Sequence, residues 1–455
     1  MNYTSITPDQ RQRMLEALGI DSVDALFAAI PASSRFEGEL DLPAGASELA
    51  LQRELHELAG MNRPAGAGAC FMGAGSYDHF IPTFIDQVIL RGEYLTAYTP
   101  YQAEASQGSL QAFFEFQSQV ARLTGLDIAN ASLYDGASAC AEAVNLALNA
   151  TGKRRVLVAS TVHPDTMRVL RTHLSDLPVE LVSLPAGADG KIGGATVREH
   201  ADSDTACLVM QSPNVCGVIE DWEGCFTAVT DACETGAKPL KIGVCNPIAC
   251  ALLKTPGAAG ADIACGEGQP LGIPMQFGGP YLGLFAARKE LMRKMPGRLV
   301  GEAFDPDGRR SFALVLQTRE QHIRGAKATS NVCTNQGLLA LRATMYMTAM
   351  GPGGLRDVAE QCWHKAHALA GRIASIPGFS LKHDSDFFNE FVVSCPRPAR
   401  EIVRAGVERG VLPGVALDTD RMDRIGDAGD LLVAVTEKRT AEDMDLLCDT
   451  LAGLA

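Results

Sequence analysis

Residues 317–336, QTREQHIRGAKATSNVCTNQ, hold the densest group of side chains that could do chemistry. Two arginines, a histidine and a lysine stand together here in an otherwise acidic chain. Guanidinium and ammonium groups bind carboxylates and other anions, and the amides and hydroxyls that follow can orient a ligand. We therefore expect an anion or carboxylate site in this segment. A solvated charged face is the alternative, but such faces rarely end in a run of hydroxyl and amide side chains.

Residues 98–108, YTPYQAEASQG, form a second polar group. They stand directly before a helix that Leu110, Phe113 and Val120 predict at 107–124. Each phenol and amide donates or accepts a hydrogen bond in a fixed direction, so a loop–helix junction of this composition can orient a small polar ligand. A surface loop that satisfies its own backbone explains the composition equally well.

Two further motifs are typical of ligand-binding edges of α/β sheets. Residues 133–139, LYDGASA, open a helix with a glycine turn and place Ser138 in its first turn. Such a turn can seat a phosphate, although an ordinary helix cap by Asp135 or Ser138 is the more frequent case. His163 follows an expected strand, where an imidazole can stack on a flat ring. Taken alone, it is more often a polar loop residue.

Residues 266–272, GEGQPLG, and 278–280, GGP, are rich in glycine. They do not match the dinucleotide-binding fingerprint, because the third glycine falls one position late and no helix signal follows. These glycines indicate backbone that passes close to another surface.

Composition excludes several classes of function. The formal charge of −14 and the pI of about 5.2 argue against a general affinity for nucleic acid or an anionic membrane. The longest uncharged run, 268–287, contains five glycines and three prolines and cannot form a transmembrane helix. No signal peptide is visible at the start of the sequence. Thirteen cysteines without a C-x-x-C pair fit a reducing cytoplasm better than a disulfide scaffold. Cys362, His364 and His367 fall on an expected amphipathic helix, so we expect no metal there.

Short apolar runs alternate with helical patterns through the middle of the chain and predict a mostly parallel sheet. The sequence divides into an N-terminal helical segment (1–65), a large α/β domain (66–350) and a small C-terminal α+β domain (351–455). The glycines at 351–354 mark the second boundary. The expected strands of the large domain are 155–159, 179–184, 207–210, 241–244 and 281–286.

Several long strings together resemble one family. They are YTPYQAEASQG, NASLYDGAS, QSPNVCGVIED, GEGQPLG with FGGPYLG, MPGRLVGE and LQTREQHIRGAKATSNVCTNQ. They resemble the glycine dehydrogenase (decarboxylating) P-protein of the glycine cleavage system, and within it the N-terminal half that many bacteria make as a separate alpha subunit. The resemblance runs in order over nearly the whole chain.

The resemblance implies an aminotransferase-like, pyridoxal-phosphate-dependent transferase fold (fold type I). It also implies a partner, the beta subunit, and an alpha2-beta2 heterotetramer. In this family glycine is decarboxylated on pyridoxal phosphate, and the aminomethyl group passes to the lipoyl arm of the H-protein. The cofactor supplies the electron sink.

Two departures from the family pattern bear on the chemistry. The beta-type half carries the Schiff-base lysine in an N-L-H-K-type string, whereas this chain has Gln269 or Pro270 there. A carboxylate expected near the end of strand 241–244 is replaced by Cys245 and Asn246. We therefore expect the beta subunit, not this chain, to bind the cofactor. The expected remnants of a cofactor site here are Ser138, His163, Asn246 and Gln269.

The polar strings then have another expected role, at the interface with the beta subunit and close to its cofactor. The residues we expect there are Tyr98, Tyr101, Gln102, Arg319, His322, Lys327, Asn331 and Asn335. Two smaller departures are Ala105, where the family has isoleucine, and Gly325-Ala326, where it has arginine and glutamate.

Two alternatives remain open. One is an independent cofactor enzyme that uses Lys254 or Lys327 as its Schiff-base lysine. The other is a structural or regulatory partner that stabilises the beta subunit without touching its site.

Overall fold

The computed structural model describes residues 5–36, 38, 40–95, 99–233 and 236–455, and it divides into two compact units, Met1–Arg63 and Pro64–Ala455. The first unit contains helices α1 (Pro8–Leu18) and α2 (Glu48–Gly60). Thr7 caps α1, since its hydroxyl accepts the backbone N–H of Gln10 at 3.3 Å. The helical start predicted at Thr7-Pro8 is therefore confirmed.

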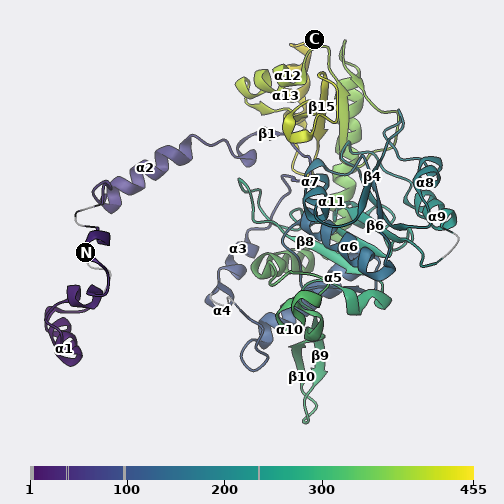
Figure 1. Ribbon diagram of the computed structural model, residues 1–455. Helices are drawn as coiled ribbons and strands as arrows, with labels where there is room; N and C mark the ends of the chain where they lie inside the picture. Colours follow the sequence, from purple (N-terminus) through teal and green to yellow (C-terminus); the bar gives the residue numbers. More distant parts are fainter. Residues whose placement is uncertain (1–4, 37, 39, 96–98, 234–235) are drawn as a thin grey trace. The chain divides into compact units, whose positions relative to one another are not determined.

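A seven-stranded sheet forms the centre of the second unit (Figure 1). Its spatial order is β2-β8-β7-β6-β5-β3-β4. The five strands from β7 to β4 are parallel, while β8 is antiparallel to both of its neighbours. The mostly parallel sheet predicted from the sequence is therefore confirmed. The strands are β2 (Ile128–Ala129), β3 (Arg155–Ala159), β4 (Glu180–Leu184), β5 (Thr205–Ser212), β6 (Leu240–Cys245), β7 (Ile263–Glu267) and β8 (Gly283–Ala287).

Helices cover both faces of this sheet. Successive residues of β8 show the two faces, because Phe285 packs into one apolar cluster and Leu284 and Ala286 into another. The first cluster includes residues of α6 (Gly136–Thr151), α7 (Pro164–Leu174), α8 (Gly194–His200) and α9 (Trp222–Ala232). The second cluster includes residues of α5 (Gln107–Thr124) and α11 (Gly337–Ala374). The predicted helix at 107–124 agrees with α5, which buries Leu110, Phe113 and Val120.

Helix α11 leads from the large sheet to a smaller one. It kinks at Gly351, whose φ of 61° and ψ of 179° lie outside the helical region, with Pro352 next to it. The element therefore consists of two helices that meet at Gly351. The predicted boundary at 350/351 falls at this kink, and the division into two domains there stays a prediction.

The smaller sheet is antiparallel, in the order β11-β12-β15-β14. It packs with α12 (Ala399–Glu408) and α13 (Ala441–Ala452) around a third apolar cluster. A short parallel pair, β1 (Ala69–Cys70) with β13 (Val411–Leu412), attaches the start of the second unit to it. The strands of the small sheet are β11 (Ser380–Leu381), β12 (Glu390–Ser394), β14 (Val415–Ala416) and β15 (Asp430–Ala434).

A hairpin of β9 (Val300–Phe304) and β10 (Arg310–Leu314) extends away from the main sheet (Figure 1). Local sequence patterns did not predict this hairpin. The second unit also contains three short helices, α3 (Phe84–Ile89), α4 (Gly92–Leu95) and α10 (Gln321–Arg324). Over the described residues, every helix is too short or too polar to span a membrane.

Candidate functional site

A cavity of about 480 Å³ lies at the carboxyl ends of the parallel strands. This is the edge at which open α/β sheets bind ligands. Asp135–Ala137 at the start of α6, His163 after β3 and Asn246 after β6 line it. Ser138 is in the adjoining first turn of α6, and Gln269 is between the lining residues Glu267 and Pro270. Two of the four predicted remnants, His163 and Asn246, therefore line the cavity, and Ser138 and Gln269 lie next to lining residues.

His163 is fixed by its own chain. Its Nδ1 accepts the backbone N–H of Asp165 at 3.1 Å, so the proton lies on Nε2, which donates to the carbonyl oxygen of Ala74 at 3.0 Å. Burial lowers the pKa of the imidazole, although Asp165 opposes this. The ring is thus held neutral at the cavity wall.

The side-chain amides of Asn246 and Gln269 also form hydrogen bonds to the backbone of the chain. Asn246 Oδ1 accepts the backbone N–H groups of Ile248 and Ala249. Gln269 is buried, and its amide accepts from the Tyr77 N–H at 2.9 Å and donates to the Tyr77 carbonyl at 3.0 Å. Gln269 therefore joins the loop after β7 to the segment that follows β1.

Two glutamates in the cavity wall have strongly shifted pKa values. Glu390 accepts hydrogen bonds from the Tyr77 hydroxyl at 2.6 Å and the Ala74 N–H at 2.7 Å. Burial nonetheless raises its pKa to about 7. Burial also raises the pKa of Glu267 to about 7, against three backbone N–H bonds that lower it.

A second polar group, which we call the arginine cluster, is centred on Arg298 and Glu320. These two form an ion pair that is almost completely buried, with side-chain exposures of 11% and 3%. Arg298 also donates to the carbonyl of Cys333 at 2.9 Å and lies over the Tyr101 ring, 5.0 Å from its centre. Arg298 thereby connects the two polar strings singled out in the sequence.

Three predicted interface residues bond within this cluster. Arg319 donates to the carbonyl oxygens of Met295 and Gly297, at 2.5 and 2.6 Å. The Tyr101 hydroxyl donates to Asn335 Oδ1 at 2.5 Å. Asn335 in turn donates to the Ala131 carbonyl at 2.7 Å. Burial lowers the pKa of Arg319, although Glu320 opposes this.

The remaining predicted interface residues are exposed. They are Gln102, His322, Lys327 and Asn331. His322 is 40% exposed, with Nδ1 3.9 Å from the Glu320 carboxylate. Tyr98 lies outside the described residues. The arginine cluster and the cavity adjoin, because Tyr134 and Gln336 line the cavity and Tyr134 accepts the backbone N–H of Cys333 at 3.3 Å.

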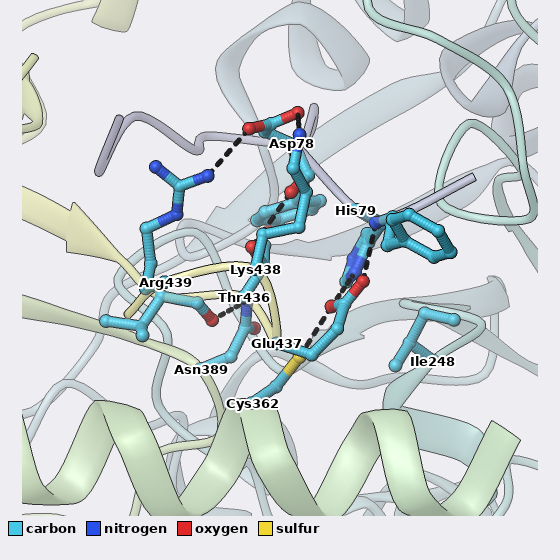
Figure 2. Close-up of polar contacts among 12 residues, drawn as sticks. Asp78, His79, Ile248, Cys362, Asn389, Thr436, Glu437, Lys438 and Arg439 are labelled. Atoms are coloured by element: carbon cyan, nitrogen blue, oxygen red, sulfur yellow. Dashed lines mark hydrogen bonds and ion pairs between the residues drawn. The ribbon is translucent and has the colours of Figure 1, made fainter. Parts of the chain in front are cut away.

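A third buried polar group, formed by His79, Cys362 and Glu437, is separate from the cavity and the arginine cluster (Figure 2). Glu437 accepts from His79 Nδ1 at 2.7 Å and from Cys362 Sγ at 3.5 Å. These three offer metal-ligand atoms within 4.8 Å of one another. The neighbouring Asp78 pairs with Lys438 and Arg439. His367, which shared a sequence motif with Cys362, stacks on Phe387 at 4.0 Å instead.

Comparison with known proteins identifies the family. A family model described as "Glycine cleavage system P-protein" matches residues 1–451. The chain belongs to this family. It is 49% identical over 453 residues, 99% of each chain, to "Probable glycine dehydrogenase (decarboxylating) subunit 1" of Thermomicrobium roseum. It is 46% identical over 454 residues, all of both chains, to the protein of the same name from Chlorobium chlorochromatii. The resemblance noted in the sequence is confirmed.

Solved structures agree with this assignment. A crystal structure of glycine decarboxylase (P-protein) of the glycine cleavage system, in inhibitor-bound form, superimposes with a TM-score of 0.90. It is 40% identical, and the match covers 100% of both chains. A NifS-like protein, 13% identical, matches 85% of this chain and 98% of its own with a TM-score of 0.62, which shows the fold alone. The predicted fold type I architecture is confirmed.

Fold type I implies pyridoxal phosphate, but the residues of this cavity do not fit that cofactor. A Schiff base needs a lysine, and none is found among the described residues that line the cavity. Lys254 pairs with Glu223 at 2.5 Å beside a different cavity, and Lys327 is exposed. The end of β6 offers the Asn246 amide instead of a carboxylate. We assign no catalytic step to a cofactor held in this chain.

Sequence reasoning missed four residues that organise these sites. They are Tyr77, Glu267, Arg298 and Glu390. Arg298 belongs to the string MPGRLVGE, where a charged residue between Gly297 and Leu299 was its only local signal. Glu390 carried no signal, because its partner Tyr77 is 313 residues away.

Proposed function

We propose that this chain is the alpha subunit of a two-chain glycine dehydrogenase (decarboxylating), the P-protein of the glycine cleavage system. With a beta subunit it decarboxylates glycine and passes the aminomethyl group to the lipoyl arm of the H-protein. Pyridoxal phosphate is held by the beta subunit. The assembly is an alpha2-beta2 heterotetramer in the cytoplasm.

One observation carries this proposal. The chain matches P-protein subunit 1 relatives over its full length, yet its cavity lacks a lysine among the described lining residues. A chain that keeps the family fold without the group that binds the cofactor fits a subunit that acts with a catalytic partner.

The contribution of this chain is to position groups at the partner's site. Arg298, Glu320 and Arg319 hold the backbone of residues 295–297 and 333 in place. The same framework presents His322, Lys327 and Asn331 to solvent. An ammonium group, an imidazole and an amide on a rigid base can orient a glycine carboxylate or a lipoyl amide. Tyr98, Tyr101, Gln102 and Asn335 belong to the same proposed interface.

A second candidate function is a structural partner that never touches the beta site. The bonds of Arg319 favour it, because both terminal nitrogens of this side chain already bind carbonyls of its own chain. A side chain used in this way is not available to a substrate carboxylate.

Glycine–carbon dioxide exchange tests the proposal. The rate is measured for this chain alone, for the beta chain alone and for the mixture, each with pyridoxal phosphate and H-protein. Exchange in the mixture only is the expected result. Exchange by this chain alone would favour an independent enzyme, and Lys254 and Lys327 would be the residues to replace. Full exchange by a beta chain that is merely stabilised by other means would favour the structural role.

A further inference from the structure

The amino end of α6 faces the cavity with its first N–H groups. In open α/β sheets such an end can receive an anionic ligand group, because the free N–H groups and the helix dipole both attract negative charge. Here Asp135 Oδ1 already accepts the N–H of Ser138 at 2.7 Å. The N–H of Gly136, the first helical residue, donates to Glu267 Oε2 at 3.0 Å.

Glu267 is held at this position from three sides. In addition to Gly136, the backbone N–H groups of Gln269 and Leu282 donate to its other oxygen, Oε1, at 3.0 and 2.9 Å. These donors come from α6, from the loop after β7 and from the segment before β8. A carboxylate with this many fixed donors keeps one orientation.

The backbone geometry explains why the carboxylate stands so close to the helix. A Cβ atom added at Gly136 would lie 2.7 Å from the Glu267 nitrogen. One added at Gly283 would lie 2.6 Å from the Asp135 carbonyl oxygen. Only glycine permits β7, β8 and α6 to approach this closely, so the Glu267 side chain emerges directly beside the helix end.

We propose that the Glu267 carboxyl group occupies the position that a ligand's phosphate would need at the amino end of α6, and so excludes phosphate from it. A phosphate there would overlap the Glu267 side chain and would find the Gly136 N–H already used. Above pH 7, where Glu267 is ionised, it would also meet a like charge. The cavity of about 480 Å³ is large enough for a small ligand, so the obstacle to phosphate is local, at the Glu267 carboxyl group and the N–H that it uses.

Rejection of phosphate by Glu267 holds whether or not the proposed function is correct. It adds a third obstacle to cofactor binding beside the missing lysine and the missing carboxylate. The other two features only remove groups that bind pyridoxal phosphate, whereas Glu267 excludes any phosphate-bearing ligand. Binding measurements test it without reference to turnover.

The experiment compares the full-length chain with a Glu267→Gln variant. Inorganic phosphate and pyridoxamine 5′-phosphate are titrated, with pyridoxamine as the phosphate-free probe. Pyridoxamine compounds carry no aldehyde, so they do not form Schiff bases with surface lysines. At pH 8, where Glu267 of the native chain is ionised, we expect the variant to bind both phosphate-bearing probes at least tenfold more tightly than the native chain, with no gain for pyridoxamine.

Glu390→Gln is the matched control, because Glu390 lines the same cavity and also has a pKa raised by burial to about 7. It does not touch the α6 end, so this variant should gain no phosphate affinity. Glu267→Ser serves as a second variant if the amide disturbs folding, which thermal melting checks. Equal phosphate binding by the native chain and both Glu267 variants would overturn the proposal. So would an equal gain in Glu390→Gln.

Discussion

The cavity and the arginine cluster adjoin at Tyr134 and Gln336, but they use their polar groups differently. In the cavity, the amides of Asn246 and Gln269 and the imidazole of His163 all bond to backbone of their own chain. In the arginine cluster, an inner layer made of Arg298, Arg319 and Asn335 also bonds to backbone carbonyls of the chain. An outer layer, with His322 and Lys327, stays exposed.

The polar groups of the cavity are thus bonded within the chain, whereas those of the outer layer of the arginine cluster are exposed to solvent. Cavity groups that bind their own backbone have less capacity left for a ligand. The exposed groups can still bind a ligand or a partner, and the buried Arg298–Glu320 pair holds the backbone that carries them in place. We therefore expect the functional residues of this chain in the outer layer of the arginine cluster and not in the cavity.

The largest expected effect comes from the inner layer. Arg298→Ala would leave Glu320 charged, buried and without its partner, and we expect a loss of about 3–5 kcal/mol in the free energy of unfolding. Urea titration measures this. The control is Arg372→Ala, which breaks an exposed pair with Asp445 and should cost less than about 1 kcal/mol. Equal losses of unfolding free energy in the two variants would show that the Arg298–Glu320 pair contributes no more than an exposed ion pair.

The next largest expected effect tests whether the cavity wall at Glu390 is buried. The pKa of Glu390 is raised from 4.5 to about 7 in the folded chain, so the folded state binds the proton more tightly than the unfolded state. Its contribution to stability is complete below pH 4.5 and is lost as the pH rises to about 7. The loss is up to about 3 kcal/mol for a shift of this size.

Comparison of the native chain with Glu390→Gln isolates this contribution. The difference between their unfolding free energies should change by up to about 3 kcal/mol between pH 4.5 and 7, because glutamine does not titrate. Denaturant titrations over this pH range measure the difference. A constant difference would mean that Glu390 is solvated and that the cavity wall is open.

The smallest effect on stability, but a clear effect on activity, is expected for the outer layer. His322→Ala and Lys327→Ala should change the unfolding free energy by less than about 0.5 kcal/mol, since both side chains are exposed. In the mixture with the beta chain each should lower glycine exchange at least tenfold, about 1.4 kcal/mol. Lys289→Ala, exposed elsewhere, is the control. Native exchange rates with intact assembly would remove both residues from the interface.

Much of the fold follows from local sequence patterns. Strands such as β3 and β5 are short apolar runs, and α5 shows an apolar face, so both kinds of element could be predicted. Strand β7 was missed because Gly266 and Gly268 resemble loop residues, whereas Ile263 and Cys265 are buried between β6 and β8. Its place depends on neighbours that a local pattern does not contain.

The candidate site was predictable only in part and for the same reason. His163 was singled out because it lies in the loop after a strand of the parallel sheet, and Asn246 was singled out from the family pattern; their role as remnants of a cofactor site stays a prediction. The Arg298–Glu320 pair spans 22 residues and the Tyr77–Glu390 bond 313, so no motif links their members. The proposed interface roles of the polar strings stay predictions.

The central claim is that this chain keeps the family fold while a partner holds the reactive cofactor. Borohydride reduction of the assembled, cofactor-loaded complex, followed by peptide mapping, tests it most directly, because reduction fixes the Schiff base to the lysine that forms it. We predict a pyridoxyl label on a lysine of the beta chain and none on this one. A stoichiometric label on Lys254, Lys327 or any other lysine of this chain would contradict the account.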